Sequence, residues 1–151
     1  MYYYIIDPPP GVPASRISQK LQELVTPMGI AGEIAVANPA RSAEELTYMG
    51  LDKGFTTLIA VGGEELVNTV ATIIINESHE KIALGVIPIN AGRLLPDMIG
   101  CPNNDMRRGA EIIKQRHLDL VDVVQVASKR FMVTEAYILP PRKVKLTVEV
   151  N

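Results

Sequence analysis

Short apolar runs alternate with amphipathic segments over most of the chain. The candidate strands are residues 2–6, 33–36, 56–61 and 82–89. The segments between them carry apolar residues at helical spacing. This alternation is typical of a parallel sheet covered by helices, so the predicted fold class is α/β. The run 82–89 is apolar throughout, which indicates a strand buried on both faces.

Local signals set the expected helix ends. Ser15 is predicted to cap a helix with apolar positions at 17, 21, 24 and 25, which ends before Thr26-Pro27. Ser42 followed by Glu45 has capping-box spacing, and that helix runs toward Lys53 with Gly54 as its stop. A third helix begins near Glu64, and Asn103 or Asn104 is expected to cap a fourth, with Met106, Ala110 and Ile113 at core spacing.

The pattern changes after His117. Three strands are predicted at residues 118–126, 130–138 and 142–150, with no helix between them. The last alternates apolar and polar residues, as a half-exposed antiparallel strand does. We therefore expect an α/β domain over residues 1–122 and a small antiparallel β extension over 123–151, with a boundary near Asp122.

Composition narrows the function classes. A net charge of -2 gives no general attraction to nucleic acid, and no lysine-rich block favours an anionic membrane. Cys101 is the only cysteine, so an internal disulfide is excluded. The N-terminus lacks the features of a signal peptide, and the apolar runs are too short to cross a bilayer. A cytoplasmic protein is expected.

The most informative motif is the strand that ends in Gly62-Gly63 and leads into a helix, a common phosphate-binding geometry. The segment LIAVGGEELVNTV resembles the strand, GGDGT loop and helix of the diacylglycerol kinase catalytic domain family, in the lipid kinase and NAD kinase-like superfamily. Further on, LGVIPINAGRLLPDMIGCP resembles that family's second block, close to GIIPLGTGNDFAR. Residues 110–113 and 118–120 are similar to the helix and strand that lead to its second domain, and Ile6-Asp7-Pro8 with Gly11 to its first phosphate loop.

This resemblance covers about residues 2–126. It implies a Rossmann-like parallel sheet with flanking helices, followed by a β-sandwich domain, with ATP and Mg²⁺ between the two. The positions that match the family's nucleotide-binding motifs are Asp7, Gly11, Gly62, Gly63, Glu64, Asn68 and Gly92. No catalytic residue and no metal ligand is assigned.

Several motif positions depart from the family pattern. Glu64 stands at the aspartate, Glu65 at the third glycine and Leu66 at the threonine of GGDGT. In the second block, Ala91, Arg93 and Leu94 replace the Thr, Asn and Asp; in the first loop, Asp7 replaces asparagine and Pro10 replaces serine. A carboxylate ~4 Å from a phosphate charge, at an effective dielectric near 20, costs about 4 kcal/mol. Such a cost lowers affinity roughly a thousandfold unless a metal ion intervenes.

These departures predict a non-catalytic, pseudokinase-like binding or interaction domain, with a nucleotide or phosphorylated small molecule as candidate ligand. About 30 residues follow Asp122, fewer than the β domain of the resembled family needs. One alternative is a divergent ATP-dependent lipid kinase that another chain completes, with Glu64 in the aspartate role. The other is a homo-oligomer formed through an edge strand at residues 142–151.

Each candidate also has a plainer interpretation. Gly62-Gly63 is a tight turn, Glu64 and Glu65 are favourable charges at a helix start, and Arg93 is a solvated side chain. His79 and His117 have no ligand partner at metal spacing. Cys101 is a small apolar filler, and Arg107 and Arg108 lie on a solvated helix face.

Overall fold

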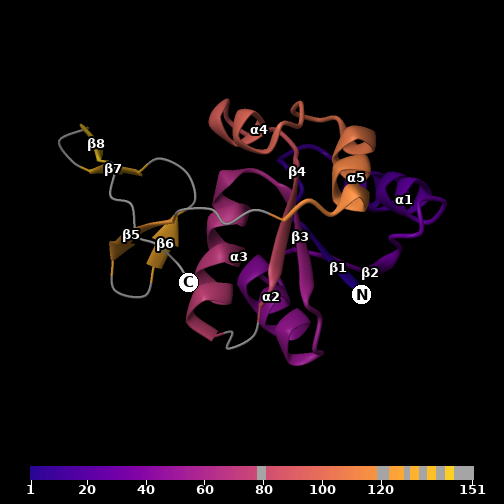
Figure 1. Cartoon of the computed structure of the whole chain (residues 1–151), viewed down its shortest axis with the longest axis horizontal. Coiled ribbons are helices and arrows are strands. Elements are labelled where there is room, and N and C mark those ends of the chain that lie inside the picture. The colour runs from indigo at the N-terminus through magenta and orange to yellow at the C-terminus, as the bar shows by residue number, and fades with distance from the viewer. Residues whose placement is uncertain (78–80, 119–122, 128–129, 133–135, 139–141, 145–151) are drawn as a thin grey trace.

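The computed structural model describes residues 1–77, 81–118, 123–127, 130–132, 136–138 and 142–144 (Figure 1). The helices are α1 (Ala14–Val25), α2 (Ala43–Asp52), α3 (Glu64–Glu77), α4 (Leu94–Ile99) and α5 (Met106–Gln115). The strands are β1 (Tyr2–Ile6), β2 (Gly32–Val36), β3 (Thr57–Gly62), β4 (Ala83–Pro88), β5 (Val124–Ala127), β6 (Arg130–Met132), β7 (Ala136–Ile138) and β8 (Arg142–Val144).

A four-stranded parallel sheet forms the centre of the fold, in the order β2-β1-β3-β4. Strand β1 lies between two neighbours, and its residues 3 to 6 are fully buried. Because successive side chains of a strand point to opposite faces, Tyr4 and Ile6 enter one core and Tyr3 and Ile5 enter the other. Because both faces of β1 are buried, the strand requires an unbroken run of apolar residues.

Helices cover both faces of the sheet (Figure 1). On one face, α1 and α5 supply Ile17, Leu21, Met106 and Ala110 to the core around Tyr4. On the other, α2, α3 and α4 supply Leu46, Leu66, Val70 and Leu95 to the core around Tyr3. The predicted Rossmann-like α/β class is confirmed, with the helices on both sides of one sheet.

The two buried tyrosines of β1 fasten the sheet to helix α2 and to the segment that follows α1. The hydroxyl of Tyr3 donates to the Leu46 carbonyl oxygen at 2.8 Å, and that of Tyr4 donates to the Ile30 carbonyl oxygen at 2.5 Å. Burial raises the pKa of both phenols, so both stay protonated donors at neutral pH. These bonds satisfy polar groups that burial would otherwise leave without a partner.

Most of the predicted element boundaries are confirmed. Ser42 caps α2, since its Oγ accepts from the Glu45 N–H at 3.1 Å, and α1 ends at Val25, next to Thr26. Gly54 follows the C-cap of α2 with a φ of 83°, which glycine adopts without strain.

Three local predictions were wrong. Helix α1 begins two residues earlier than expected, with Pro13 instead of Ser15 at the N-cap in an extended conformation, so Ser15 lies inside the helix. Asp105 rather than Asn103 or Asn104 caps α5. Strand β4 lies at one end of the four-stranded order, so its first four residues are only partly buried instead of being covered on both faces.

The described C-terminal residues form two antiparallel pairs, β5 with β6 and β7 with β8, and β6 lies against α3 (Figure 1). The expected antiparallel character is thus confirmed, but the described strands are shorter than predicted. The predicted strand at 130–138 contains β6 and β7, which belong to different pairs. Leu118 is exposed and belongs to no strand. Asp122 and most of the proposed edge strand 142–151 lie outside the described residues, so the domain boundary and the oligomer both stay predictions.

Gly50 gives a direct test of the packing around β1. An added Cβ at this position in α2 would lie 2.6 Å from Cδ1 of the buried Tyr3 ring. We expect Gly50→Ala to destabilise the fold by about 1–2 kcal/mol, since overpacking of this kind costs ~1–3 kcal/mol and the gain in helix propensity returns up to ~1. Urea denaturation measures the change.

Gly109→Ala is the matched control for this substitution. Its Cβ would meet Ile87 at 3.0 Å, a less severe contact with an aliphatic side chain, so the loss should be smaller. A Gly50→Ala chain that is as stable as the wild type would contradict the packing described here.

Candidate functional site at the carboxyl edge of the sheet

The chain reverses its direction of winding between β1 and β3. Strand β1 leads into α1 on one face of the sheet, whereas the neighbouring β3 leads into α3 on the other. In open parallel sheets, ligands bind outside the carboxyl ends of the strands at such a switch point. The loop that starts at Asp7 and the loop at Gly62-Gly63 form this part of the structure.

Backbone hydrogen bonds keep the loops after β1, β3 and β4 side by side. The Asp7 N–H donates to the Val61 carbonyl oxygen at 3.1 Å, and the Ile89 N–H donates to the Gly62 carbonyl oxygen at 3.0 Å. The parallel pairing of the three strands therefore continues into their loops. Residues distant in the sequence are brought together at one edge.

Gly62, the last residue of β3, and Gly63, which follows it, differ in what an added side chain would contact. A Cβ on Gly62 would lie 2.9 Å from Cδ2 of Leu66 and 3.3 Å from the Asp7 carbonyl oxygen. A side chain at Gly62 would therefore require the buried Leu66 side chain to shift. A Cβ on Gly63 would have only ordinary contacts, the nearest at 3.8 Å, with Cα of Ala91.

Helix α3 begins directly after this turn with two carboxylates. The Gly63 carbonyl oxygen accepts from the Val67 N–H at 3.2 Å, and Glu64 and Glu65 occupy the first turn. The Glu64 side chain reaches the loop after β4, because its Oε1 lies 2.7 Å from where a Cβ on Gly92 would be. Gly92 thus leaves room for this carboxylate.

The charge of Glu65 acts on Asp7 at this edge. Partial desolvation and then the negative charge of Glu65 raise the pKa of Asp7, although its side chain is exposed. Asp7, Glu64 and Glu65 therefore come together around the loops after β1, β3 and β4.

The loop after β4 is held by two side chains that the sequence analysis assigned to another role. The Asn90 N–H donates to Oδ1 of Asn104 at 2.9 Å, and the Ala91 N–H donates to Oδ1 of Asn103 at 3.1 Å. Nδ2 of Asn103 returns a bond of 2.7 Å to the Ala91 carbonyl oxygen. The adjacent asparagines in the sequence were read only as helix caps, so this contact was missed.

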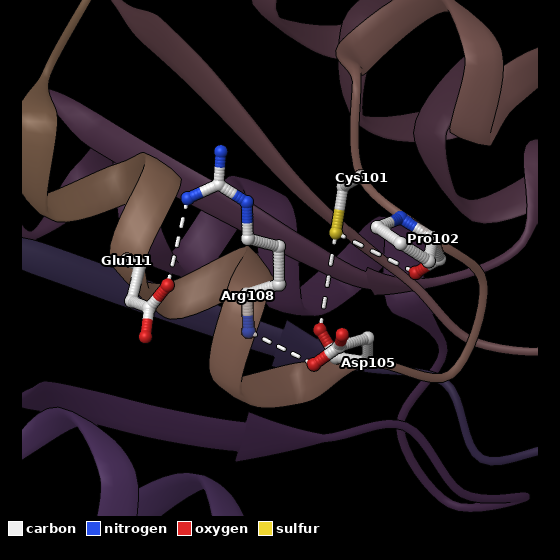
Figure 2. Close-up of polar contacts among 5 residues, drawn as sticks. All are labelled: Cys101, Pro102, Asp105, Arg108 and Glu111. Carbon is white, nitrogen blue, oxygen red and sulfur yellow. Dashed lines mark hydrogen bonds and ion pairs between the residues drawn. The ribbon is translucent and has the colours of Figure 1, made fainter.

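The segment that carries these asparagines is itself fixed (Figure 2). Asp105 caps α5 by accepting the Arg108 N–H at 3.0 Å, and the buried Cys101 thiol faces the carbonyl oxygens of Pro102 and Asp105 at 3.5 and 3.8 Å. Burial, followed by the nearby Asp105 charge, raises the pKa of Cys101. The thiol therefore stays protonated and acts as a packing group, in line with its predicted role.

The remaining candidates contribute less to this edge. Gly11 lies in the exposed turn before α1 with a φ of 81°, and Asn68 is partly buried on α3. Arg93 makes a 3.9 Å contact with Asp97 in which the two side chains are 94% and 73% exposed, so both charges remain solvated. Arg108 and Glu111 pair at 3.5 Å (Figure 2). His117 is exposed, and His79 lies outside the described residues.

Within the described part of the chain, no group of three His, Cys, Asp or Glu side chains is arranged to hold a metal ion. Nor is any helix among those residues long and apolar enough to cross a membrane.

Comparison with known families agrees with this geometry. The profile described as Diacylglycerol kinase catalytic domain matches residues 4–126, from β1 to β5. The chain belongs to this family. A search of curated proteins found no match.

The family implies ATP with Mg²⁺, and the residues at this edge fit that group only in part. The strand-turn-helix backbone at Gly63 has the shape that anion sites use. The side chains do not fit, because Asp7, Glu64 and Glu65 place negative charge on the loops where a triphosphate would lie. Two of the N–H groups in the loop after β4 already have side-chain acceptors.

The raised pKa of Asp7 predicts a pH-dependent effect of removing its charge. The folded chain holds the Asp7 proton to a higher pH than the unfolded chain does, so the ionised group lowers stability above the raised pKa. Asp7→Asn should stabilise the fold at pH 7, by less than about 1 kcal/mol because the side chain is exposed. The gain should disappear below the usual aspartate pKa of about 3.9.

Thermal unfolding across a pH series measures this effect. Glu65→Gln should give part of the same gain at pH 7, since it removes the charge that adds to the shift. An Asp7→Asn chain that is less stable than the wild type at pH 7 would contradict the proximity of the two carboxylates.

Proposed function

We propose that this family member is a non-catalytic binding or interaction domain that has kept the kinase fold and does not use ATP as a phosphoryl donor. The observation that supports this proposal best is the set of carboxylates at the carboxyl edge of the sheet. Glu64 reaches Gly92, and Glu65 acts on Asp7, so both gaps between neighbouring loops carry negative charge. The loops that would surround a phosphate group repel one.

The carboxylates at this edge impose a free-energy cost on phosphate binding that can be estimated. Exposed charges are screened by water and salt, so each carboxylate at this edge opposes a phosphate by about 0.5–1 kcal/mol rather than by the larger value of a buried pair. Three such groups together lower affinity by roughly 10- to 100-fold. Phosphoryl transfer needs the opposite arrangement, with cations and N–H donors around the phosphates.

The packing of Leu66 supports the same conclusion. It stands at the threonine position of the GGDGT-like motif, yet its side chain is 2% exposed and belongs to the core around Tyr3. Its Cδ2 also occupies the space beside Gly62. This motif position therefore serves stability here, and no hydroxyl is presented to a ligand.

A charge-neutralised variant tests the proposal. Asp7→Asn, Glu64→Gln and Glu65→Gln combined should raise the affinity for Mg²⁺-ATP by roughly 10- to 100-fold in isothermal titration. Glu77→Gln, at the far end of the same helix, should leave it unchanged. A second combined variant carries Glu65→Gly in place of Glu65→Gln. Both variants lack the charge, but only glycine adds backbone freedom, so the glycine variant should bind Mg²⁺-ATP more tightly.

A lipid kinase assay of the wild-type chain tests the proposal directly. The wild-type chain, supplied with Mg²⁺-ATP and diacylglycerol in mixed micelles, should form no phosphorylated lipid above the protein-free blank. Lipid phosphorylation by the purified wild-type chain would refute the proposal.

The alternative is a divergent ATP-dependent lipid kinase that another chain completes. The orientation of Glu64 favours it, because this carboxylate stands at the family's aspartate position and faces Gly92. Under this alternative, Glu64→Gln and Gly92→Ala should each abolish turnover in the completed assembly, whereas Glu77→Gln should not. Unchanged turnover in the first two variants would refute it.

A further inference from the structure

We propose that Asn103 and Asn104 are positioning residues, which act as an internal clamp and occupy the backbone N–H groups of the loop after β4. Their side-chain oxygens take the places that a ligand's oxygens would need in order to bind those N–H groups. This inference goes beyond the proposed function, because it concerns how the loop is held and is independent of whether ATP binds.

The clamp uses both polar atoms of one side chain and the oxygen of the next. Asn103 accepts the Ala91 N–H at 3.1 Å and donates to the carbonyl oxygen of the same residue at 2.7 Å. Asn104 accepts the Asn90 N–H at 2.9 Å. Residues 12 to 14 positions apart in the sequence are thereby fastened together at one end of the sheet.

The backbone of both segments is shaped for this contact. Asn90 has a φ of 47° and Asn104 a φ of 63°, in the left-handed region that asparagine tolerates better than most residues. The Asn104 N–H donates to the Pro88 carbonyl oxygen at 2.9 Å, which holds it against the end of β4. The next residue, Asp105, caps α5, so the clamp rests on a fixed helix start (Figure 2).

The clamp has a consequence for any anion that approaches this edge. An anion that needs the N–H groups of Asn90 and Ala91 must first displace the two asparagine oxygens. At the usual net worth of a hydrogen bond, this displacement lowers affinity by roughly 5- to 150-fold. The same bonds hold the loop in one shape without a ligand, and so keep Gly92 beside the Glu64 carboxylate.

Amide hydrogen exchange of the full wild-type chain, followed by NMR, tests the clamp. The N–H groups of Asn90 and Ala91 should exchange more slowly than those of Gly92 and Arg93, for which no acceptor is found among the described residues. The difference should be roughly 2- to 13-fold or more for each bond. Equal exchange at all four positions would overturn the proposal.

Variants of Asn104 then separate the clamp from general stability. Asn104→Gly keeps the left-handed backbone but removes the acceptor, so Asn90 should lose its protection while amides of β3 keep theirs. Asn104→Asp retains Oδ1 and should restore the protection of Asn90. If Asn90 exchanges equally in the glycine and aspartate variants, Asn104 does not position the loop.

Asn103 offers a second, independent variant. Asn103→Asp keeps the acceptor for the Ala91 N–H but loses the donor to its carbonyl oxygen, so protection of Ala91 should fall to an intermediate level. Asn103→Ala should remove it. If a variant fails to fold, the exchange rates of the four wild-type amides still test the clamp. The exchange measurements on the wild-type chain and on the variants do not depend on the outcome of the ATP titrations.

Discussion

The parallel pairing of β1, β3 and β4 determines what the rest of this molecule can do. Strand hydrogen bonds continue into the loops, from the Asp7 N–H to Val61 and from the Ile89 N–H to Gly62. Whichever side chains follow the strands are therefore forced to share one edge. In this chain they include Asp7, Glu64 and Glu65. Partial desolvation, and then the negative charge of Glu65, raise the pKa of Asp7.

The fold tolerates this charge because its stability comes from elsewhere. Strand β1 is buried on both faces, and its buried Tyr3 and Tyr4 are hydrogen-bonded to Leu46 in α2 and to Ile30 in the segment after α1. At the other end of the sheet, the Arg116 guanidinium donates to Oγ1 of Thr57 at 3.1 Å and lies over the Tyr2 ring at 5.9 Å. A fold held in this way can keep its architecture while the residues at its ligand edge change, which is why family membership and activity need separate arguments.

Much of the fold could be predicted from the sequence, because periodicity reports which faces are buried. The apolar run at residues 2–6 and the helical spacing of 17, 21, 24 and 25 correspond to buried positions. The helix cap at Ser42 could also be predicted, because it depends only on residues that are close in the sequence. Helix α4 was not expected, because six residues with a central proline carry too weak a pattern.

The site was harder to predict, because its contacts join residues distant in sequence. Resemblance placed Asp7, Gly63, Glu64 and Gly92 in one region. It did not predict that Glu64 reaches toward Gly92 or that the charge of Glu65 acts on Asp7. Asn103 and Asn104 were assigned to a helix cap, a role that Asp105 takes. Because Asp105 caps the helix, which begins at Met106, the side chains of both asparagines can bond the loop after β4.

We propose that this edge of the sheet rejects a triphosphate although the chain belongs to a kinase family. The most direct measurement is an NMR titration of the labelled wild-type chain with ATP, with and without Mg²⁺, following the amides of Gly63 and Gly92. We expect neither amide to show a saturating shift up to millimolar ATP. Saturating shifts at both glycines at micromolar ATP would contradict the account, because the loops would then form a working phosphate site despite their carboxylates.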